Sequence, residues 1–400
     1  QAQQEKGNIQ RLADRYAIFF TPLTLLIAAI GFWITQEVIT ILAVLVVATP
    51  CPLILATPIA VLSGINRAAK VGIIVKGGAP LEKLAQVDVV VFDKTGTLTQ
   101  GIPVIEKIVV FPGVEYTPDQ ILYRAGIIEQ RSAHAVAKAT TRTALEKFSV
   151  LPTPTHMREV PGAGVTGDHQ SEHISVGTAE YIQTQIAPDF IESYVAFLQT
   201  FAREEKLVSV IAMNGRCLGA IFFADTPRGG AKDMINALRR MGIHHIIMLT
   251  GDNARNAHRI AKTLGISLYR ATLHPEDKVT VLKEISARHP HTLMVGDGIN
   301  DAPALATAYV GMAMGAQGVA ISAQAADIVL LEDNIERVVD ALSIGRRMLL
   351  IAKQGIWLGM GLSLVLMCIA ALGYIPPPVG AVLQEIIDVT VIFNALRARK

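Results

Sequence analysis

Long apolar runs near both ends of the chain constrain its fold more than any other feature. They lie at roughly Ala17 to Ile34, Ile39 to Leu62, Leu349 to Tyr374 and Pro377 to Leu396. Each is about long enough to cross a hydrocarbon core of ~30 Å as a helix. The chain is 51% hydrophobic, which is high for a soluble protein with 18% charged residues. We therefore predict four transmembrane α-helices, two on each side of a large middle segment.

Basic residues indicate how these spans are oriented. Arg67 and Lys70 follow the second run, and Arg397 and Arg399 follow the last. Excess Lys and Arg mark the cytoplasmic side of a membrane protein. We therefore expect a multi-pass protein of the plasma membrane, with the middle segment in the cytoplasm and two short outer loops.

Composition excludes some other classes of protein. A formal net charge of +2 favours neither a nucleic-acid binder nor an enzyme for acidic substrates. Three widely separated cysteines do not form a disulfide framework, and they fit a reducing cytoplasm. The opening stretch is polar and does not resemble a signal peptide. We expect the chain to have been cut from a longer protein.

The middle segment, about Lys83 to Ala341, alternates short β-rich runs with helical patterns. Several runs end in polar loops, as in VDVVVFDKTGT, HIIMLTGDN and TLMVGDGIND. This alternation is typical of an α/β, doubly wound parallel sheet, whose ligands bind at the carboxyl ends of the strands. Such loops are missing between about Ile102 and Asp225. We predict that this stretch is a second domain inserted into the first.

The loop residues have the chemistry needed for phosphoryl transfer. Asp93 begins Asp-Lys-Thr-Gly-Thr-Leu-Thr, and a carboxylate there can attack a γ-phosphate. Thr250–Asp252 offers a hydroxyl and backbone amides to phosphoryl oxygens, and Lys278 offers a positive charge. Asp297 provides a carboxylate for Mg²⁺. The residues predicted to carry the reaction are Asp93, Lys94, Thr95, Thr250, Gly251, Asp252, Lys278, Asn300 and Asp301.

A lone aspartate at the end of a strand is more often structural than nucleophilic. Here, four such elements occur in an order that favours phosphoryl transfer, which depends mainly on positioning and charge neutralisation. This set closely resembles the P-type ATPases of the haloacid-dehalogenase superfamily over essentially the whole chain. The resemblance implies that Asp93 is phosphorylated by ATP, and that Asp93, Asp297 and the carbonyl of Thr95 hold Mg²⁺.

The family also implies how long the acyl phosphate lasts. Superfamily phosphatases usually carry a second aspartate, an acid/base, where this chain has Thr95. Its absence is expected to lengthen the life of the acyl phosphate, which suits a pump.

The inserted stretch resembles the nucleotide-binding domain of the metal-transporting branch. In that branch a Ser-Glu-His-Pro motif preceded by Glu contacts adenine. Glu129 and His134 match it, whereas Ala133 and Ala135 replace the motif's Glu and Pro. The resemblance implies that Glu129 and His134 bind nucleotide. The alternative for His134 is an ordinary surface or core histidine.

Two further pairs of residues match the same domain. Gly162 and Gly164 match a Gly-x-Gly loop beneath the nucleotide, where missing side chains allow a close approach. Asp225 and Arg228 resemble the family's hinge residues, although a helix start with a proline near its first position explains them equally well.

The second apolar run contains Ala-Thr49-Pro-Cys51-Pro. Paired prolines interrupt a helical ladder and free carbonyls beside a thiol at membrane depth. The alternative is a simple proline kink with a buried cysteine acting as a small hydrophobe.

The last run favours a metal site. Gln384, Glu385 and Asp388 are spaced by three and four residues, so we expect them on about one helical face. Two carboxyls inside a span are costly and indicate function. Glu385 alone could be solvated near an interface.

One thiolate with oxygen donors suits borderline divalent ions better than Cu(I). Thr-Pro-Cys with Gln-Glu-x-x-Asp resembles a subgroup associated with nickel, iron and cobalt export, and Zn²⁺ remains open. The residues expected to bind the transported ion are Thr49, Cys51, Gln384, Glu385 and Asp388.

The resemblance implies a haloacid-dehalogenase-like Rossmannoid phosphorylation domain with an inserted α+β nucleotide-binding domain. We place its parts at 83–101 and 226–341, the inserted domain at 102–225, and paired spans at 1–82 and 342–400. An actuator domain and earlier spans are expected before the first residue, and no nucleic-acid partner is expected. Without them, we expect phosphorylation but neither rapid turnover nor transport. The rival functions are a soluble phosphatase of the superfamily and a non-pumping membrane sensor.

Overall fold

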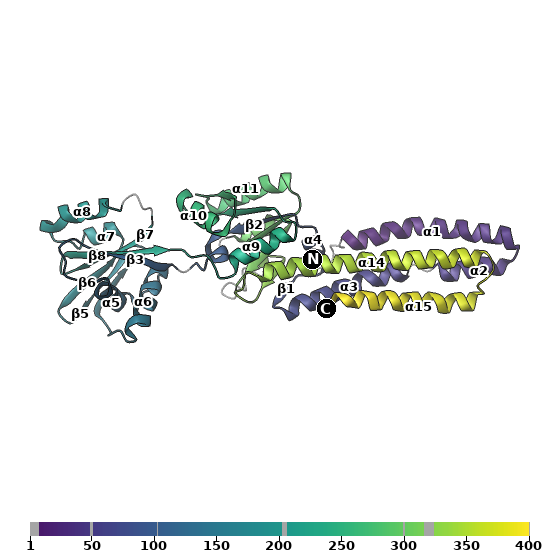
Figure 1. The fold of residues 1–400 in the computed structure, drawn as a ribbon, viewed down its shortest axis with the longest axis horizontal. Helices are drawn as coiled ribbons and strands as arrows, with labels where there is room; N and C mark the ends of the chain where they lie inside the picture. Colours follow the sequence, from purple (N-terminus) through teal and green to yellow (C-terminus); the bar gives the residue numbers. More distant parts are fainter. Residues whose placement is uncertain are drawn as a thin grey trace.

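The structure is a computed structural model that describes residues 8–48, 51–101, 103–201, 206–298, 301–315 and 324–399. For residues 8–17 and 51–55 it describes the backbone alone. Three parts follow one another along the long axis (Figure 1). These are an antiparallel sheet with helices, a largely parallel sheet with helices, and a bundle of long helices.

A seven-stranded sheet forms the middle part, in the order β1-β13-β12-β11-β2-β9-β10. All neighbouring strands are parallel except β1 and β13. The strands are β1 (Ile73–Val75), β2 (Val89–Asp93), β9 (His245–Leu249), β10 (Leu268–Arg270), β11 (Thr292–Gly296), β12 (Val310–Met314) and β13 (Ile328–Leu330). The helices of this part are α4 (Gly78–Leu84), α9 (Ala231–Arg240), α10 (Ala254–Leu264), α11 (Pro275–Arg288) and α12 (Ala302–Thr307).

Strand β2 is central to this sheet and is buried at every position. Val90 and Phe92 belong to one core with residues of α9 and α10, and Val89 and Val91 belong to another with residues of α11 and α12. A parallel strand covered on both faces is expected to be apolar throughout. Asp93 is therefore the exception in β2, and it lies at the carboxyl end.

A six-stranded antiparallel sheet forms the inserted part, in the order β3-β8-β7-β6-β5-β4. The chain enters it after the Asp93 loop and returns to α9. An isolated bridge between Thr99 and Pro227 joins the two connections. The predicted insertion is confirmed. Its elements are β3 (Val104–Val110), α5 (Pro118–Glu129), α6 (Ala135–Phe148), β4 (Thr155–Val160), β5 (Gly164–His169), β6 (Glu172–Gly177), α7 (Ala179–Gln183), α8 (Ile191–Gln199), β7 (Leu207–Met213) and β8 (Arg216–Ala224).

The bundle contains α1 (Asn8–Thr35), α2 (Val38–Val47), α3 (Cys51–Lys70), α14 (Arg337–Ala371) and α15 (Pro377–Leu396). Within the described residues, three helical segments are long and apolar enough to cross a membrane: Ile18–Thr35, Arg337–Ala371 and Pro377–Arg399. The second predicted span, Ile39 to Leu62, instead corresponds to two helices. These are the short apolar α2 and the first part of the longer α3. The short α1–α2 and α14–α15 connections lie at the end of the bundle farthest from the sheets (Figure 1).

Helix α14 connects the bundle to the parallel sheet without a break. Its 35 residues correspond to about 52 Å of helix, well beyond the ~20 residues that a span needs. Val338, Leu342 and Met348 lie in the same core as strand β2, whereas Met367 and Ala370 lie in the core of the bundle. One continuous helix therefore belongs to both the core of the parallel sheet and the core of the bundle.

Close packing of α1 on α14 gives a testable prediction. A Cβ atom added at Gly31 would lie 3.0 Å from both the Cα and the carbonyl oxygen of Ala371. Because backbone atoms cannot move aside easily, Gly31→Ala is expected to lower the free energy of unfolding by about 1–3 kcal/mol. Thermal unfolding of the purified protein in detergent measures this change.

Gly361→Ala is the matched control, because a Cβ atom at Gly361 of α14 would meet nothing within 4 Å. Alanine also favours the helix at that position. The control should melt at or slightly above the wild-type temperature. Equal melting temperatures for the two variants would contradict the packing described.

Candidate phosphoryl-transfer and metal sites

Asp93 ends β2, and the chain then turns sharply through Lys94–Leu98. Gly96 has a φ of +73°, a conformation that residues with a side chain rarely adopt. A Cβ atom there would also lie 3.2 Å from Oδ2 of Asp297. A glycine is thus needed both for the turn and for the closeness of Asp297.

Lys278, in the first turn of α11, joins two buried carboxylates. Its Nζ donates to Oδ1 of Asp93 at 2.6 Å and to Oδ1 of Asp301 at 2.8 Å. Asp93 is 3% exposed and Asp301 1%. Burial, followed by the charge of Asp301, raises the pKa of Asp93 to about 7 although Lys278 lowers it. Burial lowers the pKa of Lys278, but Asp93 and Asp301 outweigh this effect, so its pKa is raised.

Thr250 and Gly251 lie beside Asp93, because β9 neighbours β2 and pairs Asp93 with Leu249. Thr250 is buried, and its hydroxyl accepts a hydrogen bond from the backbone amide of Asp252 at 3.0 Å. Gly251 has little room, since a Cβ atom would lie 3.1 Å from the carbonyl oxygen of Leu273. The amides of Thr250 and Asp252 are used within the protein, on the carbonyl of Arg270 and the Thr250 hydroxyl, so within the described chain the amide of Gly251 is the one left for a ligand beside Asp93.

Lys94 connects the loops around the site to the inserted part. Its buried Nζ pairs with Asp225 at 2.5 Å and with Asp252 at 2.6 Å. Thr99 also donates to Asp225, at 2.8 Å. Lys94 therefore ties the chain's return from the six-stranded sheet to the loop after β9.

Arg228 holds the Asp93 loop from the other side. Its guanidinium donates to the carbonyl of Gly96 at 2.7 Å and pairs with Asp333 at 2.5 Å. Asp225 and Arg228 thus lie at the return from the inserted part and contact the Asp93 loop rather than the cavity of the inserted part. Sequence reasoning missed Asp333, because a single acid in a polar loop has no distinctive pattern.

The donors present fit a magnesium ion. Asp93 ends β2 and Asp297 follows the neighbouring parallel strand β11, and the nearby charge of Asp297 contributes to the raised pKa of Asp93. Carboxylates and carbonyls are the oxygen ligands that Mg²⁺ prefers. Thr95 is exposed and lines a cavity beside these residues. Asn300 lies outside the described residues.

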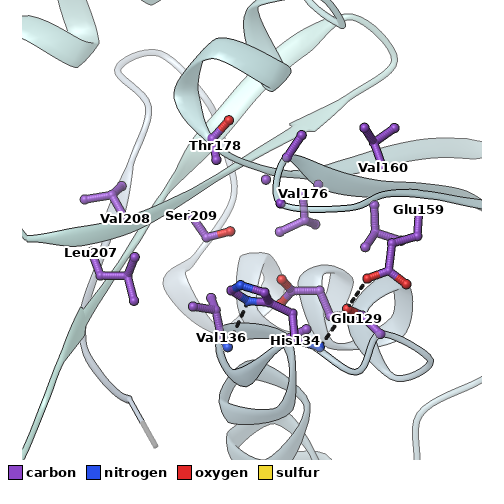
Figure 2. Close-up of a pocket in the computed structure, with 17 residues that line it drawn as sticks. Glu129, His134, Val136, Glu159, Val160, Val176, Thr178, Leu207, Val208 and Ser209 are labelled. Atoms are coloured by element: carbon purple, nitrogen blue, oxygen red, sulfur yellow. Dashed lines mark hydrogen bonds between the residues drawn. The ribbon is translucent and has the colours of Figure 1, made fainter. Parts of the chain in front are cut away.

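The inserted part contains a cavity of about 520 Å³, and four predicted residues line it: Glu129, His134, Gly162 and Gly164. Figure 2 shows Glu129 and His134 approaching it from one side and Val160, Val176 and Thr178 from the other. Glu129 is 5% exposed, and burial raises its pKa to about 7 although a hydrogen bond with Thr140 lowers it. Its Oε2 has no hydrogen-bond partner.

His134 immediately precedes α6 and caps its first turn. The backbone amide of Val136 donates to its Nδ1 at 3.3 Å (Figure 2). A neutral ring that accepts at Nδ1 carries its proton at Nε2. That nitrogen is then a donor.

The two loop glycines serve different purposes. Gly162 has a φ of +75°, and a Cβ atom there would meet nothing within 4 Å. At Gly164 a Cβ atom would lie 2.4 Å from the ring of Tyr181 and 2.5 Å from the carbonyl of Val176. Close packing within the protein therefore explains Gly164, and the turn explains Gly162.

Glu159 is a residue of this cavity that sequence reasoning missed. Its Oε1 accepts a hydrogen bond from Ser132 at 2.7 Å, and Ser132 Oγ in turn accepts from the amide of His134 at 3.2 Å (Figure 2). Strand β4 is thus linked to the residue that begins α6. The altered motif at Ala133 was the available signal, but Glu159 comes 27 positions after Ser132, too far along the chain for a local pattern to show the pair.

A second cavity, of about 1150 Å³, lies between the two sheets. The inserted part contributes His134 and Lys206, and the parallel-sheet part contributes Lys94, Thr95 and Asp252. His134 lines both cavities. The route from the first cavity to the loop of Asp93 therefore runs between the two parts.

In the bundle, Gln384 and Asp388 lie on the buried face of α15, at 3% and 6% exposure. Gln384 donates to Asp388 at 3.1 Å and accepts from Ser363 of α14 at 3.2 Å. Glu385 is exposed, so the prediction that all three share one face is wrong. Successive side chains on a helix point about 100° apart, so Gln384 and Glu385 cannot both face the bundle directly. Packing of the helices buries Gln384 rather than Glu385.

The predicted thiol site lies at the limit of what the structure describes. Thr49 and the side chain of Cys51 fall outside the described residues. Among the residues that the structure describes, no group of three or more His, Cys, Asp or Glu is placed to hold a metal ion. Of the residues predicted to bind the transported ion, Gln384 and Asp388 are therefore the ones whose side chains the structure describes as buried in the bundle.

The sequence of the chain is similar to those of known proteins with related catalytic domains. A model of the haloacid dehalogenase-like hydrolase family matches residues 87–308. The copper-exporting P-type ATPase of Bacillus subtilis is 34% identical, with all of this chain and 50% of that protein covered. The manganese-exporting P-type ATPase of Mycobacterium bovis is 32% identical, with 99% of this chain and 55% of that protein covered. The chain spans about half the length of the curated relatives it matches.

Solved structures are also similar. A zinc-transporting PIB-type ATPase in the E2.Pi state has a TM-score of 0.83 at 31% identity, covering all of this chain and 66% of that one. The catalytic domain of a CPx-ATPase has a TM-score of 0.54 at 29% identity, covering 70% of this chain and 98% of that one. The family model matches more than half of the chain, so the chain belongs to the haloacid dehalogenase-like hydrolase family, and its relatives over the full length are metal-transporting P-type ATPases.

Proposed function

We propose that this chain is the catalytic half of an ATP-driven pump that moves a divalent transition-metal ion out of the cell. The observation that carries the proposal is the buried Asp93 carboxylate, held 2.6 Å from the Nζ of Lys278 at the carboxyl end of a parallel strand. Relatives over the whole chain are named as metal-exporting or metal-transporting P-type ATPases, which supports the proposal.

In the proposed reaction, an Asp93 oxygen attacks the γ-phosphorus of ATP. A bond forms between that oxygen and phosphorus, the bond to the bridging oxygen breaks, and ADP leaves with the electron pair. Lys278 provides positive charge next to the attacking group, and the Thr250 hydroxyl and the Gly251 amide offer donors to the phosphoryl oxygens.

Mg²⁺ would be held by Asp93, Asp297 and the carbonyl of Thr95. When bound, it supplies positive charge to the transferring phosphoryl group. Thr95 has no carboxyl group, so it cannot act as the acid/base that superfamily phosphatases use. The acyl phosphate is therefore expected to persist long enough for the spans to move.

The nucleotide is proposed to occupy the cavity lined by Glu129, His134, Gly162 and Gly164. Its phosphates would extend through the second cavity toward Asp93. Lys206, Arg255 and Arg259 line that route and bring positive charge to it. Lys94 also lines it, but its ammonium is already paired with Asp225 and Asp252.

The transported ion is proposed to bind where α15 carries Asp388 and Gln384, together with Cys51 and Thr49. Oxygen donors with one thiolate suit borderline divalent ions. We favour nickel, iron or cobalt on this donor set. The relatives are named for copper, zinc and manganese, so zinc or cadmium and copper are the alternatives.

Two functions of other classes remain as rivals. A phosphatase of the superfamily would release phosphate quickly, whereas a pump retains the label on Asp93. A membrane sensor without transport would show no ATP turnover that depends on a metal ion. Lys278, paired with both Asp93 and Asp301, argues for a working catalytic site rather than a vestigial one.

The proposal predicts metal-dependent ATPase activity of the full-length protein. Nickel, iron or cobalt should stimulate ATP hydrolysis more than zinc, cadmium or copper. Asp388→Ala should abolish that stimulation, because it removes the buried carboxylate of α15. ATPase assays of the purified protein in lipid, with each ion in turn, measure both effects.

Glu385→Ala is the matched control, since Glu385 is the neighbouring acid on the exposed face of α15. It should retain stimulation by the same ion. Stimulation by zinc or copper alone would still be consistent with a metal pump, but it would contradict the proposed choice of nickel, iron or cobalt. Loss of stimulation in Glu385→Ala but not in Asp388→Ala would overturn the proposed site.

The link from Glu159 to His134 makes a second prediction. Glu159→Ala removes the acceptor of Ser132, so the loop before α6 loses an anchor. We expect ATP affinity to fall about fivefold to tenfold, with the maximal extent of phosphorylation unchanged at saturating ATP. Titration with ATP, read by phosphorylation of the full-length protein, measures both quantities.

Arg158→Ala serves as the control, because Arg158 is exposed on the same strand and does not line the cavity. Its ATP affinity should match the wild type. An unchanged affinity in Glu159→Ala would show that the hydrogen-bonded chain does not position His134.

A further inference from the structure

A groove of about 1520 Å³ lies along α14 and the end of α15, apart from the sites above. Arg346 donates to the backbone carbonyls of Met241 and Val87 in the parallel-sheet part. Ala85, just after α4, also lines the groove. The groove therefore lies at the end of the bundle nearest the sheets, where the cytoplasmic surface of the membrane is expected.

The groove is positively charged. Arg346, Lys353 and Arg397 line it, and no acidic residue does. Arg397 donates to the side chain of Asn394 at 2.9 Å, and within the described chain none of the three pairs with a carboxylate. Lys353 and Arg397 are exposed, so their charges are available to an anion.

The rest of the groove is apolar and faces outward from the bundle. Trp357 is 59% exposed, Leu350 55% and Leu358 44%. Trp357 follows Lys353 by four residues, which is about 6 Å along the helix axis. Tryptophan and lysine are both typical of the boundary between headgroups and acyl chains.

We propose that this groove binds an anionic phospholipid, such as phosphatidylglycerol, from the cytoplasmic leaflet. Its phosphodiester would lie against Lys353 and Arg397, which come from different helices, and its acyl chains would lie along Leu350, Trp357 and Leu358. Basic pockets between helices on this side of a membrane bind such headgroups. A soluble anion would leave the apolar half of the groove uncovered, so the combination favours a lipid.

The proposal depends on the membrane placement of α14 and α15 and not on the identity of the transported ion. The lipid would join the two helices at the point where α14 leaves the bilayer for the catalytic core. Its effect is therefore expected on the α14–α15 pair, whatever ion the pump carries.

Native mass spectrometry of the full-length protein in detergent, titrated with phosphatidylglycerol or phosphatidylcholine, tests the proposal. Wild-type protein should bind phosphatidylglycerol in preference to phosphatidylcholine. Lys353→Gln and Arg397→Gln should each weaken phosphatidylglycerol binding about fivefold. Lys353→Arg keeps the charge and should retain binding, which separates loss of the site from misfolding.

Lys70→Gln is the matched control, because Lys70 is an exposed basic residue at the same end of the bundle but outside the groove. It should bind phosphatidylglycerol as the wild type does. Equal binding of the two lipids, or unchanged binding in both groove variants, would overturn the proposal. Competition by millimolar glycerol phosphate would instead identify a site for soluble anions and would overturn it equally.

Discussion

The contact between Lys278 and Asp93 is the interaction on which the catalytic structure depends. A carboxylate that is 3% exposed is stable only if paired, and breaking a buried pair by removing one partner typically costs about 3–5 kcal/mol. Lys278 pairs with Asp93 and Asp301 together, so one ammonium joins α11, the end of β2 and the start of α12. The proposed nucleophile, Asp93, is consequently fixed by contacts within the protein itself.

A second set of contacts connects this site to the rest of the molecule. Lys94 and Arg228 attach the return from the inserted part to the loops around Asp93. Helix α14 extends from the core of the parallel sheet into the bundle, where Ser363 contacts Gln384 of α15. Contacts therefore connect the return from the inserted part, the parallel sheet, and the buried carboxamide and carboxylate of the bundle.

Local patterns predicted most of the fold and the loops around Asp93. An apolar strand followed by a polar turn can be recognised from consecutive residues of the sequence. The order of the strands then brought Asp93, Thr250 and Asp297 together as parallel-sheet geometry requires. Spacing could not tell which of Gln384 and Glu385 is buried, since helix packing decides that choice. Pairs far apart in the chain, such as Ser132 with Glu159, depend on tertiary structure that no local pattern encodes.

Phosphorylation of the full-length protein by ATP labelled at the γ-phosphate tests the central claim most directly. We expect an acid-stable label that hydroxylamine removes, as is typical of an acyl phosphate, and that is absent from Asp93→Asn. That variant should still bind ATP, since the cavity proposed to hold the nucleotide lies in the inserted part. A label that persists in Asp93→Asn, or that resists hydroxylamine in the wild type, would contradict the account.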